Sequence, residues 1–260
     1  MKKHLHFLSV PSTNLYMKEL IEKHPADEVR KTFPPFFAVT ADRQTAGRGR
    51  QGKRWESARG ENLLLSLLLY PDIHPSKQFI ICEYISIAAL EVLRDAFSLI
   101  DVSVKWPNDI YVKHKKIAGI LIEHFITGDA INYSIVGIGL NINQKAFPPS
   151  LSCTTSLSLE TQRKYDVSTC MEILIEKVKQ TVRLSDSLLK IRYEDSLYLK
   201  GEFAYFILPA VSGAPTLLKI TGVDQTGRLQ LVNKNDVPSS CAFNEIIYCS
   251  QRTMAGEDLE

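Results

Sequence analysis

The pattern of hydrophobic and polar positions predicts a mixed domain of strands and helices. Short apolar runs bounded by turn residues are typical of strands. A Lys-His-Lys-Lys segment at 113–116 predicts a tight hairpin turn between two of them. The predicted strands of this domain span residues 36–41, 63–70, 102–106, 110–112, 117–123 and 131–139.

Three helices are predicted between these strands. Ser12 is a suitable N-cap for a helix that ends near Glu22. A second helix, residues 77–97, is apolar on nearly all sides and is therefore expected to be buried. A third begins at Asp166 or Ser168, and its apolar spacing extends it to about Tyr193.

The pattern of apolar and turn-forming residues changes after about residue 198. Turn-rich segments containing Gly, Pro, Asn and Asp separate short apolar runs at 203–208, 217–223, 228–232 and 242–249. Such a series predicts a small β-barrel. We therefore expect two domains, residues 1–198 and residues 199–260.

Composition limits the class of protein. The 260 residues include 31 Lys and Arg against 29 Asp and Glu, a net charge of +2, and 45% are hydrophobic. These values exclude a disordered or collagen-like chain and do not mark a general nucleic-acid binder. Five cysteines without a CxxC pair indicate buried thiols in a reducing compartment. Without a signal peptide or membrane span in the sequence, we expect a cytoplasmic protein.

One segment, residues 42–55, has no hydrophobic period and is predicted to be a loop between two strands. Twelve consecutive residues of this segment, 43–54, contain five cations interleaved with glycines: Arg43, Arg48, Arg50, Lys53 and Arg54. Arginine makes bidentate contacts with phosphate or carboxylate, and glycine lets the backbone approach a ligand. The segment therefore favours an anionic ligand over the alternative of a solvated basic surface loop.

Two familiar phosphate-binding motifs match this loop only in part. Residues 47–52 fit G-x-G-x-x-G, and Gly47, Gly52 and Lys53 fit most of the P-loop pattern. Both motifs require a helix to follow, whereas a strand is predicted here, and Arg54 stands where the P-loop needs Ser or Thr. We therefore interpret both matches as accidental.

Several segments together resemble biotin protein ligases, in the order and at the spacing of that family. They are Ser-Thr-Asn at 12–14, the loop at 44–55, Lys-Trp-Pro-Asn-Asp at 105–109, residues 116–123, and residues 137–143. Residues 222–231 are similar to the family's small C-terminal domain. The resemblance implies an α+β fold. Its parts would be a class II aminoacyl-tRNA synthetase-like mixed sheet with helices and a small C-terminal SH3-like β-barrel.

The resemblance also implies a reaction and its partners. Biotin and ATP, with Mg²⁺, would give biotinoyl-5′-AMP, and a lysine of a biotin carboxyl carrier domain would then take the biotinoyl group. Some relatives carry an N-terminal helix-turn-helix domain. Here Ser-Thr-Asn begins at residue 12, so we expect a monofunctional form without operator DNA binding. A homodimer is possible, since relatives pair through edge strands.

By resemblance, Arg50 and Lys116 are the catalytic candidates, because fixed positive charge would bring two anionic reactants together. Asp109 is a candidate Mg²⁺ ligand, directly or through water. The implied biotin-binding residues are Ser12, Thr13, Asn14, Gln44, Gly47, Arg48, Gly49, Arg50, Lys116, Gly119 and Gly137. The implied ATP-binding residues are Arg48, Arg50, Trp55, Asn108, Lys116 and Asn141.

Simpler roles remain open for some of these residues. Ser12 could be a plain helix cap, Lys116 a hairpin-turn lysine, and Trp55 or Trp106 a core residue. At the level of function, the alternatives are a lipoyl or octanoyl transferase on the same scaffold and a nucleic-acid-binding module. The last would show a steep dependence of affinity on salt.

Overall fold

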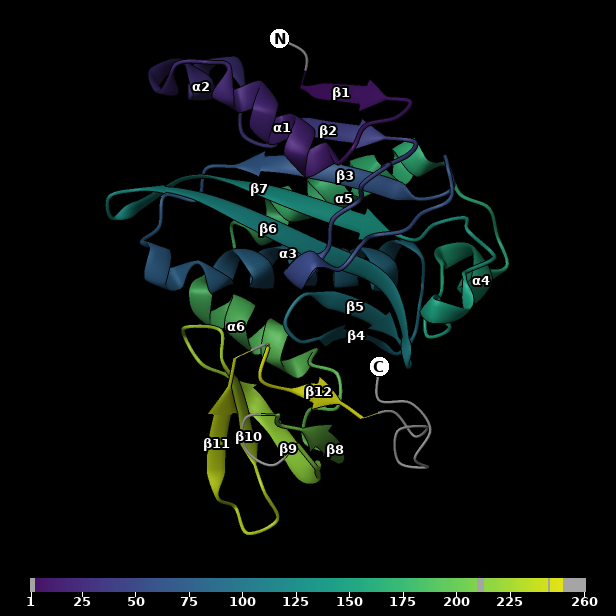
Figure 1. Cartoon of the computed structure of the whole chain (residues 1–260), viewed down its shortest axis with the longest axis vertical. Coiled ribbons are helices and arrows are strands. Elements are labelled where there is room, and N and C mark those ends of the chain that lie inside the picture. Colours follow the sequence, from purple (N-terminus) through teal and green to yellow (C-terminus); the bar gives the residue numbers. More distant parts are fainter. Residues whose placement is uncertain (1–2, 210–212, 243, 250–260) are drawn as a thin grey trace.

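The computed structural model describes residues 3–209, 213–242 and 244–249. Its centre is a seven-stranded mixed sheet, in which β1 and β2 run parallel and the remaining neighbours are antiparallel (Figure 1). In spatial order the strands are β1 (His4–Phe7), β2 (Ala38–Ala41), β3 (Leu63–Leu69), β7 (Ala130–Leu140), β6 (Lys115–Thr127), β5 (Asp109–Val112) and β4 (Val102–Lys105).

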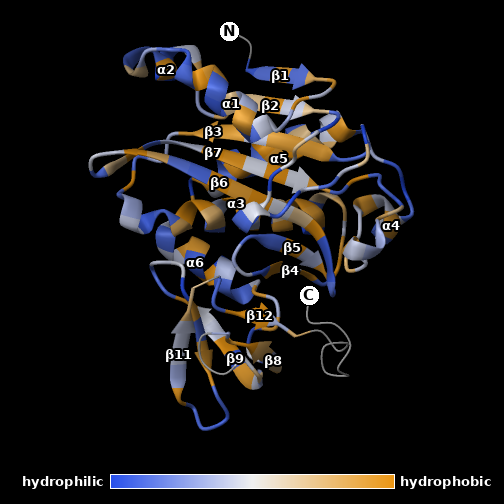
Figure 2. Ribbon diagram, in the orientation of Figure 1, coloured by the Kyte–Doolittle hydropathy of each residue, from blue (hydrophilic) through white to orange (hydrophobic). Residues whose placement is uncertain are grey.

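Helices cover both faces of this sheet. On one face lie α3 (Phe79–Glu91), α5 (Val167–Thr181) and α6 (Asp186–Asp195), and on the other lie α1 (Thr13–Glu22) and α2 (Ala26–Thr32). A short α4 (Leu157–Thr161) follows β7. Because the sheet is covered twice, all seven residues of β3 are buried and six of them are leucines. Buried apolar residues of α3 and of the central strands belong to one core cluster, and Figure 2 shows hydrophobic stretches in both α3 and these strands.

The predicted helices are largely confirmed, with one correction. The apolar segment from residue 77 forms a 3₁₀ turn (Pro75–Lys77), the buried helix α3 and a π-helical turn (Val92–Ala96). The continuous helix predicted to Tyr193 is wrong, because the chain breaks after α5. Ser185 accepts a hydrogen bond from the backbone N–H of Leu188 and so starts a second helix, α6.

The second sheet is antiparallel and contains β11 (Pro238–Cys241), β10 (Leu229–Val232), β9 (Pro215–Val223), β8 (Phe203–Ile207) and β12 (Ile247–Tyr248), in that order. The strand predicted at 242–249 is confirmed only at Ile247–Tyr248, and Phe243 within it lies outside the described residues. Glu245 accepts a hydrogen bond from the Ala242 N–H through its carboxylate, and its own N–H bonds the Ala242 carbonyl. This turn separates β11 from β12.

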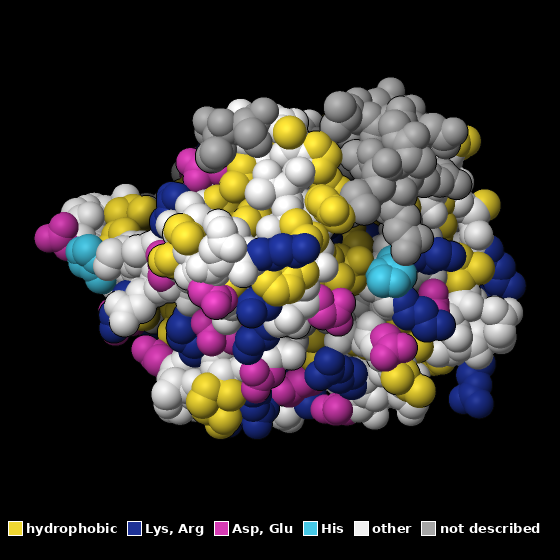
Figure 3. All heavy atoms as spheres, turned by 90° about the horizontal axis from the view of Figure 1, so that it is seen from below, with side chains coloured by type: hydrophobic (Ala, Val, Ile, Leu, Met, Phe, Trp, Pro, Cys, Tyr) yellow, Lys and Arg dark blue, Asp and Glu magenta, His cyan; other side chains and the backbone are white. Residues whose placement is uncertain are grey.

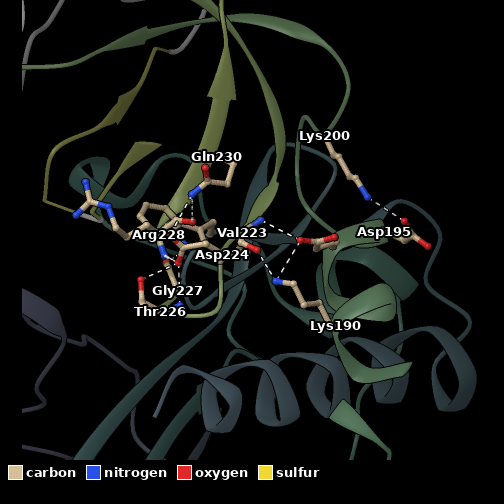
Figure 4. Close-up of polar contacts among 11 residues, drawn as sticks. Lys190, Asp195, Lys200, Val223, Asp224, Thr226, Gly227, Arg228 and Gln230 are labelled. Atoms are coloured by element: carbon tan, nitrogen blue, oxygen red, sulfur yellow. Dashed lines mark hydrogen bonds and ion pairs between the residues drawn. The ribbon is translucent and has the colours of Figure 1, made fainter. Parts of the chain in front are cut away.

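The small sheet packs against the large one through α6 and the β9–β10 turn. Lys190 of α6 donates to the Val223 carbonyl, and the Glu194 carboxylate accepts from the Val223 N–H at 3.0 Å. Figure 4 shows Lys190 beside the β9–β10 turn. In that turn the Gly227 carbonyl accepts from Trp106 Nε1 at 3.1 Å. Gly227 has φ +88°, and a side chain there would meet the ring of Phe79.

Charges are interspersed over the face shown in Figure 3, where blue and magenta side chains alternate. That distribution accords with the small net charge. Within the described part of the chain, no helix is both long and apolar enough to cross a membrane. Its cysteines are free thiols, and Cys82, Cys170 and Cys241 are buried as the sequence predicts, whereas Cys153 is exposed.

Candidate active site

Three glycines make a hollow in the large sheet on the face that carries α1. Gly119 lies on β6, and Gly137 and Gly139 lie on β7, where the first and last of these pair directly. A cavity of about 710 Å³ opens over them. Its walls come from the start of α1, residues 44–55, the β4–β5 turn, β6 and residues 244–248. Segments far apart in the sequence therefore converge on one site.

Most of the predicted site residues line this cavity. They are Ser12, Thr13, Asn14, Gln44, Arg48, Gly49, Arg50, Trp55, Asn108, Asp109, Lys116, Gly119 and Gly137. Two lie outside its lining. Gly47 lines an adjacent hollow with Arg48. Asn141 is buried behind the site, where its Nδ2 donates to the Thr155 carbonyl at 3.0 Å.

One end of the cavity is neutral and polar. Gln44 Oε1 accepts from the backbone N–H of Thr13 at 2.8 Å and from its hydroxyl at 3.1 Å. The Ser66 hydroxyl lies 2.8 Å from Thr13 Oγ1 and 2.6 Å from Asn14 Oδ1, so its one proton is shared between these two acceptors. Asn14 in turn donates to Glu123 Oε2 at 2.9 Å. Buried donors and acceptors held in a network are suited to a neutral ligand that hydrogen-bonds in both directions.

Glu123 connects this network to the loop of residues 42–55, called here the glycine–arginine loop. The second carboxylate oxygen of Glu123 lies 3.1 Å from Arg48 NH1. Neither Glu123 nor Ser66 received a role from the sequence. For Ser66 a signal existed, since it is the one polar residue of a strand that is otherwise leucine, and a buried hydroxyl needs a partner.

The other end of the cavity is cationic. Lys116 Nζ lies 2.8 Å from Asp109 Oδ1, and Arg50 and Lys105 line the same region. Among the described residues of the lining, Asp109 is the only one with a carboxylate. Burial lowers the pKa of both Arg50 and Lys105, an effect that Asp109 partly opposes. An excess of cations over carboxylates favours a polyanionic ligand here.

Trp55 lies in the glycine hollow between the two ends. A methyl group added to Gly139 would lie 2.3 Å from Trp55 Cε2, and one on Gly119 would lie 2.9 Å from Cζ3. The Lys116 ammonium is 5.5 Å from the centroid of the indole ring. The indole N–H is buried without a partner among the described residues. Trp55 therefore forms an apolar wall. Its ring fits at this position only because the glycines beneath it have no side chains.

The loop that carries Trp55 is folded into a small hairpin. Gly49 N–H donates to the Lys53 carbonyl at 2.7 Å, and Trp55 N–H donates to the Gly47 carbonyl at 3.1 Å. A three-residue 3₁₀ turn, Arg50–Gly52, forms its tip, and the chain then continues into β3. The element that follows this turn is the strand β3 and not a long helix. This agrees with the interpretation of the dinucleotide and P-loop matches as accidental.

Comparison with known proteins gives the same assignment as the motifs. A model of the biotin/lipoate A/B protein ligase family matches residues 10–141. The bifunctional ligase/repressor BirA of Bacillus subtilis is 40% identical over 136 residues, which cover 51% of this chain and 42% of that protein. The biotin–[acetyl-CoA-carboxylase] ligase of Paracoccus denitrificans is 31% identical over 145 residues, covering 52% of this chain and 58% of that protein. The chain thus spans about half the length of these relatives.

The fold is also similar to a solved structure. The biotin protein ligase of Aquifex aeolicus in complex with biotin and ATP superposes with a TM-score of 0.74 at 24% identity, covering 96% of this chain and all of that one. This likeness confirms the mixed α+β fold. Because the family model spans half of the chain, including the loop, the polar network and Lys116, the chain belongs to the biotin/lipoate A/B protein ligase family.

Proposed function

We propose that this protein is a biotin protein ligase. It activates biotin with ATP to biotinoyl-5′-AMP and then transfers the biotinoyl group to a lysine of a biotin carboxyl carrier domain. The observation that carries the proposal is the division of one cavity into a neutral polar end and a cationic end. A ring with a neutral urea group fits the first, and a carboxylate beside a triphosphate fits the second.

In the first step a carboxylate oxygen of biotin attacks the α-phosphorus of ATP, and the bond to pyrophosphate breaks. Both reactants are anions, so their approach is opposed by charge repulsion. Arg50 and Lys116 supply fixed positive charge on the cavity wall, where surrounding protein lowers the dielectric. Arg48 and Trp55 cover the adenylate from the loop side.

In the second step the neutral amine of the carrier lysine attacks the acyl carbon of the adenylate. AMP leaves, and the nitrogen loses a proton as the amide forms. The mixed anhydride is already activated, so this step needs no nucleophile from the protein. Residues of the site hold the adenylate and limit the access of water.

A magnesium ion fits the site only as an ion carried by the nucleotide. Among the residues that the structure describes, no group of three or more His, Cys, Asp or Glu side chains could hold a metal. Mg²⁺ is usually bound by one or two carboxylates together with phosphate oxygens and water. Asp109 would provide that carboxylate, and the ion would offset charge on the leaving pyrophosphate.

We infer the finer architecture from the same resemblance. Residues 1–198 are the catalytic domain, built on a class II synthetase-like sheet, and residues 199–260 are an SH3-like domain. The five short antiparallel strands β8–β12 support the second assignment. We place the protein in the cytoplasm, because its free thiols are compatible with a reducing environment.

Isothermal titration tests the proposal. We expect biotin to bind alone, and biotin with MgATP to give biotinoyl-AMP and pyrophosphate, detectable by mass spectrometry. Lipoate and octanoate in place of biotin are the controls. Binding of lipoate or octanoate but not of biotin would instead identify a lipoyl or octanoyl transferase. A protein that binds biotin but never forms the adenylate would contradict the ligase assignment.

A further inference from the structure

A buried serine lies beneath the neutral end of the cavity. Ser66 is the one polar residue of β3, and its side chain is fully buried. It is not part of the cavity lining. Its hydroxyl oxygen lies 2.8 Å from Thr13 Oγ1 and 2.6 Å from Asn14 Oδ1, and both of these residues do line the cavity. Ser66 can therefore act on a ligand only through Thr13 and Asn14.

The direction of the Thr13 hydrogen bonds follows from its contact with Gln44. Gln44 Oε1 accepts from the backbone N–H of Thr13 at 2.8 Å and from its hydroxyl at 3.1 Å. These two bonds fill the two lone pairs of the amide oxygen and use the single hydroxyl proton of Thr13. Toward Ser66, Thr13 Oγ1 can therefore only accept a hydrogen bond.

The direction of the Asn14 hydrogen bonds is fixed in the same way. Its Nδ2 donates to Glu123 Oε2 at 2.9 Å and to the Leu121 carbonyl at 3.3 Å, so both amide protons are used. The amide oxygen then faces Ser66 and can only accept. Gly137 pairs with Ser66 across β3 and β7, and a methyl group added to Gly137 would lie 2.6 Å from Asn14 Oδ1. The Asn14 oxygen thus lies directly against the sheet.

This network has two acceptors and one proton for them. The Ser66 hydroxyl carries a single proton, which can point to Thr13 Oγ1 or to Asn14 Oδ1 but not fully to both. The acceptor that does not receive it keeps a free lone pair at the cavity wall. A ligand with an N–H group would fill that lone pair, and Ser66 would then serve the other acceptor. A ligand without a donor would leave a buried acceptor unpaired, which costs free energy.

We propose that Ser66 is a positioning residue for biotin, which sets the direction of the hydrogen bonds at the neutral end of the cavity. This inference rests on the proposed ligase function. Ser66 holds Thr13 and Asn14 as acceptors and so favours a neutral ring that carries N–H groups, as the urea ring of biotin does. It has no contact with the cationic end of the cavity. Its loss should therefore weaken the binding of biotin and leave that of the nucleotide unchanged.

Ser66→Ala tests this role, because it removes the hydroxyl donor and little else. The matched control is Ser134→Ala. Ser134 of β7 is also fully buried, and its hydroxyl lies 2.9 Å from His124 Nδ1, outside the lining of the cavity. A double-mutant cycle with Thr13→Val, which removes the Thr13 oxygen and keeps the shape of the side chain, tests whether Ser66 acts through Thr13. The measurements are biotin affinity by calorimetry and the KM values for biotin and for ATP in adenylate formation.

We expect Ser66→Ala to weaken biotin binding and raise the KM for biotin by roughly fivefold to tenfold, as for loss of a buried hydrogen-bond donor. The KM for ATP should stay within about twofold of the wild type, a split that a loss of fold would not produce. In the Thr13→Val background, Ser66→Ala should cost about threefold or less, because one of its two acceptors is gone. Ser134→Ala should leave biotin affinity within about twofold of the wild type.

Wild-type biotin affinity in Ser66→Ala would overturn the inference. So would equal changes in the KM values for biotin and ATP, because Ser66 would then only support the fold. The same loss of biotin affinity with and without the Thr13 oxygen would also overturn it, since Ser66 would not act through Thr13. The outcome for the proposed function is separate. A wild-type protein that does not bind biotin removes the ligase assignment, whereas an active wild type with an unaffected Ser66→Ala variant removes only the role of Ser66.

Discussion

The Asp109 carboxylate lies 2.8 Å from the Lys116 ammonium, joining β5 to β6 at the wall of the cavity. The two strands pair so that Asp109 is opposite Gly119 and Lys116 is opposite Tyr111, with a bulge between these pairs. The ion pair fixes a long side chain that would otherwise sample many rotamers. It is about 70% shielded from solvent on each side, so the ammonium is held toward the cavity instead of projecting into water.

Lys116→Ala should slow formation of biotinoyl-AMP by roughly a hundredfold, because a preorganised positive group facing the reacting anions is lost. Single-turnover formation of the adenylate measures this rate. Lys115→Ala is the matched control, since Lys115 is the exposed neighbour on the same hairpin and should leave the rate unchanged. Equal effects of the two substitutions would show that Lys116 acts only as a turn residue.

Glu123→Gln should loosen the glycine–arginine loop. The Arg48–Glu123 pair is half-exposed and is worth up to about 1 kcal/mol, so we expect a roughly threefold to fivefold faster tryptic cleavage at residues 48–54. Glu176→Gln, which removes the exposed pair with Lys179, is the control and should leave cleavage of this loop unchanged. An unaltered cleavage rate in Glu123→Gln would show that the loop is held by other contacts.

Gly139→Ala should displace the Trp55 ring, because the added methyl group would lie 2.3 Å from Cε2. Overpacking of this kind costs about 1–3 kcal/mol of unfolding free energy, and biotin affinity should fall as the apolar wall moves. Denaturant unfolding and biotin titration measure the two effects. In a Trp55→Ala background the same substitution should cost little stability. A full penalty there would place the clash elsewhere.

Glu83→Gln should change how stability depends on pH. Burial raises the pKa of Glu83 of α3 to about 7, an effect that Glu194 and Asp186 reinforce and Lys190 opposes. A carboxyl with a raised pKa contributes fully below about pH 4.5, and its contribution is lost as pH rises through 7. The wild type should therefore lose roughly 3 kcal/mol of unfolding free energy over that window through this group.

Denaturant unfolding between pH 4.5 and 8 tests this. The unfolding free energy of Glu83→Gln relative to the wild type should rise from pH 4.5 to about 7 and level off above that, because glutamine does not ionise. The control Glu176→Gln removes an exposed carboxyl and so checks for the effect of losing one negative charge at the surface. Parallel curves for the wild type and Glu83→Gln would mean that Glu83 does not titrate in this window.

Local signals were sufficient for much of the fold. Ser12 caps α1 as its position predicts, and the leucine run forms β3. A long apolar pattern predicts a helix or a strand well, because burial of one or both faces requires apolar residues at the spacing of that element. Some shorter elements were not predicted, because contacts with other parts of the fold stabilise them. The first strand, β1, was missed because its four residues are stabilised by pairing with β2, not by their own pattern.

The fold class, the loop and most residues that line the cavity could be predicted from the amino-acid sequence, because motif residues on consecutive elements retain their order and type. How these residues contact one another became visible in the folded protein. The fold placed Trp55 over glycines far along the chain and linked Asn14 to Arg48 through Glu123. It also brought Tyr248 of the small sheet to Lys105. Such contacts depend on strand register and on how the two sheets pack, which no local pattern encodes.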